Sequence, residues 1–528
     1  MSTTTLQAPA QIQYPTGFTK WITVITAISC AILELIDTTI VNVGLREISG
    51  SIGATTTEIA WVTTSYAISN VIIIPLTSML SDLFGRRIYF TGSVILFTVA
   101  SIMCGLSGSL WTLVFWRFVQ GLGGGGLLST AQTIIIGAFP PEKISTANAI
   151  FGMGMIMGPT FGPALGGYIL DHQTWHWIFF VNIPIGIAAT FLSWTYITNR
   201  PGAVKPRKID WWGIIFLVMA IGSLQYVLEE GTSKDWFESS EIVIMSMVSL
   251  FGLVAFIYRE LSIDYPAVNI RLYKNYNLTM GSIMNLMLGM LLFGTVFIFP
   301  LFVQISLGWT PLKTGLFMIP GALCSAFAMP LVGNLLNKGA NPKLIIIIGI
   351  IMTFFFVLML GYASPDSNES NFYLPFVLRG FGLAFMMSPI LALAVGGLKG
   401  KDMTQAVGLA NMVRQLGGAI GIALINLYLT SVNAQARSNM LGYINPYNTV
   451  ASDRLNMLTQ NFMSQGFDPE RSQALANQML EGALYRQQAM VSYNQGFLMV
   501  AFAILFAIPV VLMIRYKKGT KSKMISDH

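Results

Sequence analysis

Long apolar runs recur along the whole chain and constrain its fold more than any other feature. A helix needs about 20 mostly apolar residues to cross a bilayer core roughly 30 Å thick. Such runs can be placed near residues 20–44, 58–80, 88–107, 110–138, 146–170, 177–198, 211–230, 239–259, 278–304, 312–334, 343–362, 371–397, 404–431 and 491–514. The sequence therefore predicts an all-α membrane protein with 14 transmembrane helices.

The composition excludes several other classes of protein. Only 10% of the 528 residues are charged, whereas a soluble domain has about 25%. The strands of an outer-membrane barrel alternate apolar and polar residues and do not form such long runs. The cysteines show no disulfide or zinc spacing, and no nucleophile lies in a recognisable pattern with a base. His172 and His176 have the i, i+4 spacing of a metal pair, but because they lie beside Trp175 and Trp177 they are interpreted as part of an interfacial aromatic belt. We therefore expect no enzymatic activity, no metal site and no cofactor. No DNA-binding motif accompanies the net charge of +7, so no nucleic acid is expected as a partner.

The basic residues predict how the chain is oriented. With a cytoplasmic N-terminus, about two thirds of the 30 Lys and Arg residues fall in cytoplasmic segments, as the positive-inside rule requires. We therefore expect a multi-pass protein of the cytoplasmic (inner) membrane with both termini in the cytoplasm. The predicted regions are a cytoplasmic tail at 1–19, an N-terminal six-helix half at 20–198, two inserted helices with their loops at 199–277, a C-terminal six-helix half at 278–514 and a cytoplasmic tail at 515–528.

A weak internal repeat supports the division into two halves. Asp82 and Asn337 occupy similar positions after a span and are 255 positions apart. Arg117 and Arg379 lie within spans and are 262 positions apart. Because separate markers share nearly one offset, we expect two pseudo-symmetric six-helix halves, which is a common organisation of transporters.

One outside loop, residues 432–490, is polar and rich in Gln and Asn. Asp468, Pro469 and Glu470 form a typical helix start: an N-cap, a first-turn proline and a first-turn acid. We expect an external helical hairpin that continues into the last span. Two interpretations of it stay open, namely a lid that packs on its own bundle and a docking platform for another protein.

A few charged residues lie inside the predicted spans, where an ionised side chain costs roughly 2.5–3.5 kcal/mol on insertion scales. Glu34 and Asp37 share one face of span 1, and Arg117 lies in span 4. At 1.5 Å per residue, Asp37 and Arg117 fall at about the same depth in the outer half of the membrane. They can therefore meet, as a proton switch or as a static ion pair that fixes helix register. Glu34 is interpreted as a second protonation site, a contact for a cationic substrate, or an acid that reaches toward the membrane surface.

Span 5 is rich in glycine and proline. Gly154, Gly158 and Gly162 form a ridge that permits close helix approach, and Pro159 removes a backbone donor. This pattern predicts a closely packed, bent helix that acts as a seal or hinge. A second gating element is predicted between spans 2 and 3, where a latch would be formed by Asp82, Gly85, Arg86 and Arg87.

These segments resemble the major facilitator superfamily, and within it the fourteen-span drug:proton antiporters of the EmrB and QacA type. The resemblance covers nearly the whole chain. It rests on Ile36-Asp37-Thr38-Thr39-Ile40-Val41-Asn42-Val43-Gly44-Leu45-Arg46 in span 1, the cytoplasmic motif at 78–87, Arg117-x-x-Gln120-Gly121 in span 4, and Gly158-Pro159, Gly162 and Gly166-Gly167 in span 5. The external hairpin looks most like EmrB.

The resemblance implies a major facilitator fold and a role for each group of residues. Asp37 and Arg117, with Glu34, would couple transport to protons, Asp82 would hold the cytoplasmic gate, and Gly158 and Pro159 would keep the exchange free of leaks. The candidates for lining a substrate cavity are Glu34, Asn42, Gln120, Arg379, Asn411, Arg414 and Gln415. The chain departs from the family pattern at Arg46, Glu34 and Asn337.

The leading functional hypothesis is a proton-coupled exporter of lipophilic drugs or toxic compounds that works by alternating access. One alternative is a dedicated exporter of a single metabolite, such as a fatty acid or a siderophore. Another is a channel or sensor that does not pump. The resemblance also implies two partners, a membrane-fusion adaptor and an outer-membrane channel, reached through the external hairpin.

Overall fold

The computed structural model describes residues 15–140, 143–199, 209–396, 398, 400–444 and 447–515, and all regular structure within them is helical. Thirteen helical segments among these residues are long and apolar enough to cross a membrane. The remaining predicted span is α5 (Leu110–Gly137), a 28-residue helix that is less apolar because it contains Arg117, two glutamines and several glycines. The prediction of an all-α membrane protein is confirmed.

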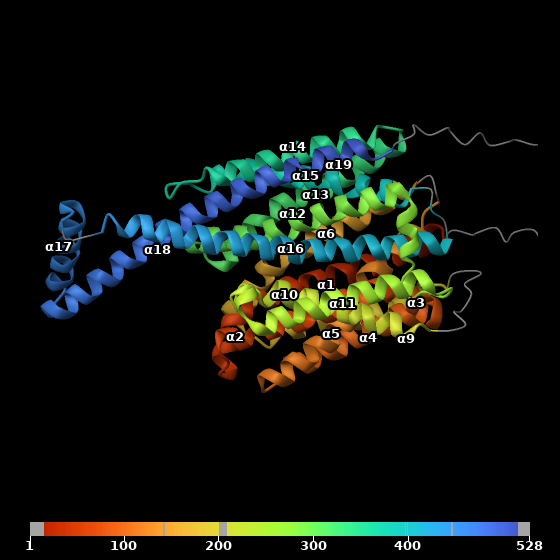
Figure 1. Ribbon diagram of the computed structural model, residues 1–528, viewed down its shortest axis with the longest axis horizontal. Coiled ribbons are helices and arrows are strands. Elements are labelled where there is room, and N and C mark those ends of the chain that lie inside the picture. Colours follow the sequence, from red (N-terminus) through yellow and green to blue (C-terminus); the bar gives the residue numbers. More distant parts are fainter. Residues whose placement is uncertain are drawn as a thin grey trace, which may run out of the picture.

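The N-terminal half is one bundle, drawn in red to yellow in Figure 1. Besides α5 it contains α1 (Gly17–Ile52), α2 (Thr56–Ile59), α3 (Trp61–Phe84), α4 (Arg86–Gly105), α6 (Ile144–His172), α7 (Trp177–Phe180) and α8 (Asn182–Tyr196). The C-terminal half lies beside it and contains α12 (Tyr276–Ser306), α13 (Pro311–Asn337), α14 (Pro342–Gly361), α15 (Ser370–Val395), α16 (Gly400–Leu441), α18 (Pro469–Leu505) and α19 (Ala507–Met513).

The two halves repeat the same packing scheme. In the N-terminal half α5 packs between α3 and α4, while α1 packs on α6 and α4 on α8. In the C-terminal half α15 packs between α13 and α14, while α12 packs on α16 and α14 on α18. Two glycines with nearly equal positive φ angles, Gly85 with φ 87° and Gly339 with φ 86°, follow the second membrane-spanning helix of each half, α3 and α13. The predicted pseudo-symmetry is therefore present in the helix packing.

The inserted helices cover one seam between the halves. They comprise α9 (Trp211–Leu217), the π-helix η2 (Val218–Gly222), α10 (Ser223–Glu230), the short 3₁₀ turns η3 (Trp236–Glu238) and η4 (Ile270–Lys274), and α11 (Ser240–Ser262). In this pair α10 contacts both α3 and α16, which belong to different halves. Within the π-helix, the Ala220 carbonyl accepts a hydrogen bond of 2.8 Å from Ser249 Oγ of α11.

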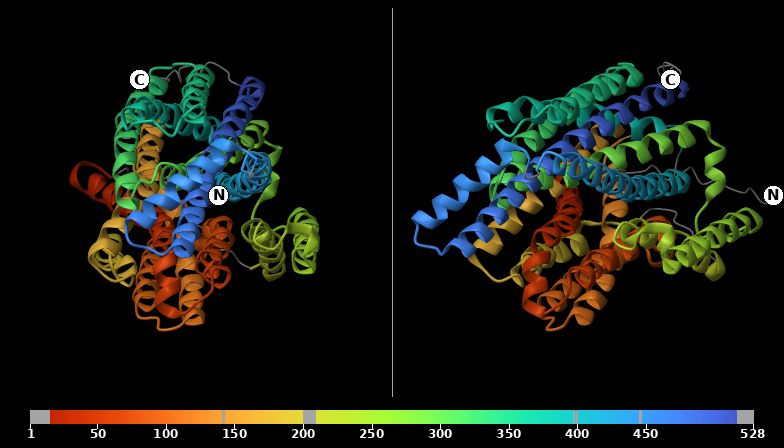
Figure 2. Two further views of the ribbon diagram at one scale, coloured as in Figure 1. Left: turned by 90° about the vertical axis from the view of Figure 1, so that its left-hand side faces the viewer. Right: turned by 60° about the vertical axis from the view of Figure 1, so that its left-hand side comes forward.

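The external hairpin extends well beyond the spans at one end of the molecule (Figures 1 and 2). It consists of the outer part of α16, α17 (Thr449–Ser464) and the first turns of α18. Asp468 Oδ1 accepts a hydrogen bond from the Arg471 backbone N–H at 2.9 Å, and Pro469 opens the helix, so the predicted helix start is confirmed. We call this end the hairpin end. The opposite end, where α1 begins and α19 ends, is the terminal end.

Candidate functional site

Asp37 is the centre of a buried polar cluster inside the N-terminal half. Its side chain is fully enclosed on α1, and Oδ2 forms an ion pair of 2.6 Å with Arg117 Nη1 from α5. Its Oδ1 accepts hydrogen bonds from Gln120 Nε2 at 2.9 Å and from Asn182 Nδ2 at 2.8 Å. The structure therefore brings Asp37 and Arg117 together, as their depths predict, and gives this carboxylate three side-chain donors.

Arg117 is held from several directions. Its Nε donates to the Val62 carbonyl at 3.2 Å, and its Nη1 also donates to Gln120 Oε1 at 2.6 Å. The guanidinium lies over the Tyr66 ring, 4.1 Å from the ring centroid. A buried arginine that is paired, hydrogen-bonded and stacked in this way has little freedom to leave its carboxylate unless the helices themselves move.

The approach of α3 and α4 to α5 depends on a run of glycines that the sequence analysis did not use. A Cβ added at Gly123 would lie 2.8 Å from the Phe97 backbone nitrogen of α4. One added at Gly125 would lie 2.5 Å from the Asn70 carbonyl of α3. Four consecutive glycines at 123–126 in a predicted span were the available signal. They allow the backbones to come close enough for residues of α1, α3 and α5 to meet around Asp37.

Glu34 lies one turn of α1 away from Asp37, in a different environment. It is 1% exposed, and its Oε1 accepts one hydrogen bond, from Asn70 Nδ2 at 2.9 Å. Its Oε2 is enclosed and has no hydrogen-bond partner among the described residues. The Tyr66 hydroxyl approaches the same point, because a Cβ added at Gly124 would lie 2.5 Å from Tyr66 Oη and 3.2 Å from Glu34 Cγ.

The C-terminal half contributes two buried arginines. Arg379 occupies in α15 the place that Arg117 has in α5, but the described residues offer it no carboxylate, and its Nε has no hydrogen-bond partner among them. Its guanidinium lies 5.6 Å from the Phe376 ring centroid. Arg414 on α16 reaches α6 of the other half, where Nη2 lies 3.8 Å from Met155 Sδ, and it interacts electrostatically with Glu34.

The other cavity candidates have different surroundings. Gln120 belongs to the Asp37 cluster, where it bonds Arg117 and Asp37. Asn411 is buried and bridges the halves, with Nδ2 2.7 Å from Gln132 Oε1 of α5. Asn42 is exposed on the outer part of α1, and Gln415 is half-buried on α16. Of the predicted residues, Glu34, Arg414 and Asn411 therefore lie where the two halves meet.

The glycine ridge of α6 packs against α1, the helix that carries both acids. A Cβ added at Gly154 would lie 2.8 Å from Ile28, and one at Gly166 would lie 3.0 Å from Ile40. Added Cβ atoms at Gly158 and Gly162 would overlap Leu35 and Thr39. Pro159 and Pro163 both lie inside the helix. The glycines predicted to permit close packing therefore form the face of α6 that contacts α1.

The opposite face of α6 packs on α13 of the other half. Near the hairpin end, a Cβ at Gly167 would lie 3.0 Å from the Leu312 backbone nitrogen. Near the terminal end, Thr146 Oγ1 accepts a hydrogen bond of 2.9 Å from Asn337 Nδ2. Because α6 touches α1 on one side and α13 on the other, it connects the acid-bearing helix to the seam between the halves.

The predicted latch lies in the turn between α3 and α4 at the terminal end. Asp82 is half-buried on the last turn of α3. Arg86 Nη2 donates to the Thr198 carbonyl at 2.7 Å, and the Arg87 backbone N–H donates to Asn199 Oδ1 at 3.0 Å. These contacts tie the turn to the segment that follows α8. Gly85 between the helices has φ 87° and ψ 140°, a conformation that is nearly restricted to glycine.

Gly85→Ala should therefore destabilise this turn by about 1–3 kcal/mol and lower transport activity. An added Cβ would also lie 3.1 Å from Asn199 Oδ1 and disturb the contact with Arg87. The thermal unfolding midpoint of the purified protein and its transport rate would measure both effects. Gly92→Ala is the control, because a Cβ at this exposed helical position meets nothing within 4 Å. Equal midpoints for the two variants would contradict the role assigned to the turn.

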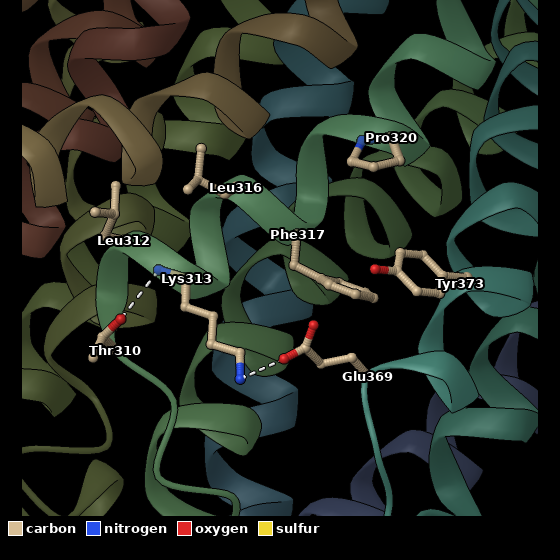
Figure 3. A pocket seen from close by; sticks show the side chains of 8 residues that line it. All are labelled: Thr310, Leu312, Lys313, Leu316, Phe317, Pro320, Glu369 and Tyr373. Atoms are coloured by element: carbon tan, nitrogen blue, oxygen red, sulfur yellow. Dashed lines mark hydrogen bonds and ion pairs between the residues drawn. The ribbon is translucent and has the colours of Figure 1, made fainter.

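Two of the cavities formed by the described residues lie in the C-terminal half. The first, of about 380 Å³, is near the hairpin end between the first turns of α13 and α15 (Figure 3). Lys313 and Glu369 form an ion pair of 2.7 Å beside it, next to Phe317 and Tyr373. The second, of about 480 Å³, is apolar and lies between α12, α16 and α18. Four methionines, which adapt readily to different shapes, line it together with leucine and isoleucine: Met287, Met290, Met386 and Met499.

The fold and the buried charge cluster are those of a membrane transporter, and comparison with known families gives its class. The major facilitator superfamily model matches residues 27–422. The chain belongs to this superfamily. Among solved structures, it is similar in fold to a bacterial homologue of the human lysosomal transporter Spinster in an inward-facing conformation, with a TM-score of 0.55, 15% identity and coverage of 96% of this chain and 100% of that chain.

Several of its curated relatives are named as resistance or export proteins. It is 32% identical to the multidrug export protein EmrB of Escherichia coli K12, over 86% of this chain and 89% of the relative. It is 31% identical to the fatty acid resistance protein FarB of Neisseria gonorrhoeae, over 93% and 95% of the two chains. It is 29% identical to the colistin resistance protein EmrB of Acinetobacter baumannii, over 95% and 97%. The resemblance to EmrB-like transporters is confirmed.

Proposed function

We propose that this transporter exports lipophilic compounds across the cytoplasmic membrane in exchange for protons. The observation that carries the proposal is the buried acid cluster of the N-terminal half, in which Glu34 and Asp37 lie on one helix and Arg117 faces Asp37. Intramembrane acids are costly to bury and mark proton or substrate pathways. The names of its relatives, multidrug export and colistin resistance, support export of toxic compounds.

Proton binding would change the balance of charge at the seam. With both acids ionised, the cluster holds Arg117 through Asp37 and attracts Arg414 through Glu34. Neutralising one acid weakens one of these attractions and changes the relative stability of the two transporter conformations. Movement of α1 is passed to α6, whose glycines fit around it, and from α6 to α13 of the other half. The halves would then alternate access around the central residues.

The test uses everted membrane vesicles and ethidium, a lipophilic cation. With an acidic lumen, vesicles that contain the protein should accumulate the dye, and a protonophore should abolish the accumulation. Vesicles without the protein provide the background. Dye accumulation that survives collapse of both the pH gradient and the membrane potential would contradict antiport. Equilibration without accumulation would indicate a channel.

A second candidate function is dedicated export of a fatty acid. Arg379 and Arg414 are buried cations that lack a carboxylate within hydrogen-bonding distance among the described residues, and both lie in the C-terminal half next to apolar surfaces. A carboxylate head with an apolar tail would complement them. The name of one relative, a fatty acid resistance protein, points the same way. Competition between ethidium and palmitate in the vesicle assay separates broad export from dedicated export.

We further propose that the protein lies in the inner membrane with both termini in the cytoplasm, so that the hairpin projects outward. The hairpin exposes apolar side chains far from the bundle, including Val450 at 75% and Met457 at 60% exposure. Exposed apolar groups on a projecting element favour a docking platform over a lid. A membrane-fusion adaptor connected to an outer-membrane channel would be the partner.

A further inference from the structure

We infer that Glu34 is the group that binds and releases the transported proton, and that Asp37 remains ionised to hold Arg117. This division of labour rests on the proposed proton-coupled transport. The two acids lie three residues apart on α1 and are both fully buried, but their partners differ. The difference in hydrogen bonding carries the inference.

Asp37 is poorly suited to take up a proton. One of its oxygens lies 2.6 Å from the Arg117 guanidinium, and the other accepts hydrogen bonds from Gln120 and Asn182. Each of these donors stabilises the carboxylate rather than the neutral acid. A proton on Asp37 would also leave Arg117 as a buried cation without a counter-ion. Breaking a buried pair in this way costs about 3–5 kcal/mol.

Glu34 has the opposite surroundings. Its nearest donors are neutral: Asn70 Nδ2 donates to Oε1, and the Tyr66 hydroxyl approaches the carboxyl, but no well-aligned donor meets Oε2 among the described residues. An enclosed carboxylate oxygen without a partner loses hydration without compensation, and a proton placed on it removes the charge. The proton would come from water on one side of the membrane, bind Oε2, and leave to water on the other side when the seam opens there.

The charged and titratable groups around Glu34 allow its state to be sensed elsewhere. Asp37 lies on the same helix, and the Tyr66 hydroxyl approaches Gly124 together with Glu34. The Arg117 guanidinium lies over the Tyr66 ring, so this tyrosine contacts the ion-pair partner of Asp37 and approaches Glu34 with its hydroxyl. Arg414 acts on Glu34 from the other half of the protein. Ionised Glu34 therefore attracts the C-terminal half, whereas neutral Glu34 does not.

Infrared spectroscopy of the purified full-length protein tests the assignment without a substrate. A protonated carboxyl gives a C=O stretching band that a carboxylate lacks, so spectra recorded between acidic and alkaline pH reveal each acid that titrates. Glu34→Gln should remove one component of this band. Asn70→Ala should shift the same component, because it deletes the hydrogen bond that Asn70 Nδ2 donates to Glu34 Oε1. Glu230 of α10 is another buried acid, and it accepts hydrogen bonds from Thr64 and Ser233. Glu230→Gln is therefore the control and should retain the component assigned to Glu34.

The assignment is wrong if Glu34→Gln removes no component, if Asn70→Ala leaves the component unshifted, or if Asp37→Asn alone removes it. The vesicle assay separates this failure from failure of the proposed function. If wild-type protein accumulates ethidium at the expense of a pH gradient and Glu34→Gln does so equally well, the coupling stands and the role of Glu34 is wrong. If the wild type shows no dependence on the gradient, proton-coupled export itself is wrong.

Discussion

Asp37→Asn should abolish uphill export while the protein still folds and reaches the membrane. The substitution keeps the shape of the side chain and one acceptor oxygen, so Arg117 and Gln120 retain part of their hydrogen bonding. It removes the only carboxylate that pairs with Arg117 among the described residues, and the arginine is left as an uncompensated buried charge. The free energy of unfolding should fall by up to about 3 kcal/mol, which is less than for deletion of the whole side chain.

Two measurements check this expectation. Accumulation of ethidium in vesicles with an acidic lumen should drop to the level of vesicles that lack the protein. The amount of folded protein, followed by fluorescence-detected size exclusion, should stay near that of the wild type. Asp171→Asn serves as the control because this acid is exposed near the end of α6. Wild-type accumulation by Asp37→Asn would show that the Asp37–Arg117 pair has no part in coupling.

Gly162→Val should disrupt transport as severely, by a different route. An added Cβ overlaps Thr39 Oγ1 and lies 3.1 Å from the Ile36 carbonyl, so the backbone of α1 must move away. Displacement of α1 moves Glu34 and Asp37 relative to α3 and α5, where their partners lie. Overpacking of this kind costs about 1–3 kcal/mol, and poor contact between α1 and α6 should also let protons leak.

Proton leak in proteoliposomes without substrate, together with ethidium accumulation, would measure the effect of Gly162→Val. Gly152, on the opposite face of the same helix, provides a matched control. A Cβ at Gly152 would meet only the flexible ends of Met329 and Met387, which can turn aside, so Gly152→Ala should transport nearly normally. Normal coupling in Gly162→Val would mean that close contact between α1 and α6 is not needed.

The sequence predicted the spans well because the length of their apolar runs is set by the thickness of the bilayer and not by tertiary detail. The helix start at Asp468 was equally clear, since a cap is set by neighbouring residues. The contact between Asp37 and Arg117 could be predicted from their depth in the membrane alone. Their helices cross the bilayer in opposite directions, and counting about 1.5 Å per residue from each end places both side chains at the same level.

Other parts of the site required tertiary information. Asn182 and Ser101 join the Asp37 cluster through hydrogen bonds, but nothing in their local sequence distinguishes them from other polar residues in spans. Likewise, the depth of Gln120 agrees with either a cavity or the cluster, and only the rotation of α5 places it beside Arg117. The contrast between the well-bonded Asp37 and the poorly bonded Glu34 also depends on which side chains surround each acid.

The most direct test of the account is the reverse reaction, because coupled antiport must run in both directions. Proteoliposomes that contain a pH-sensitive dye and the purified protein would be given an ethidium gradient but no pH gradient, with the membrane potential clamped. Proton-coupled exchange predicts that protons move against the flow of ethidium and that the movement disappears in Asp37→Asn and Glu34→Gln. Ethidium flux through the wild-type protein without any proton movement would contradict the central claim.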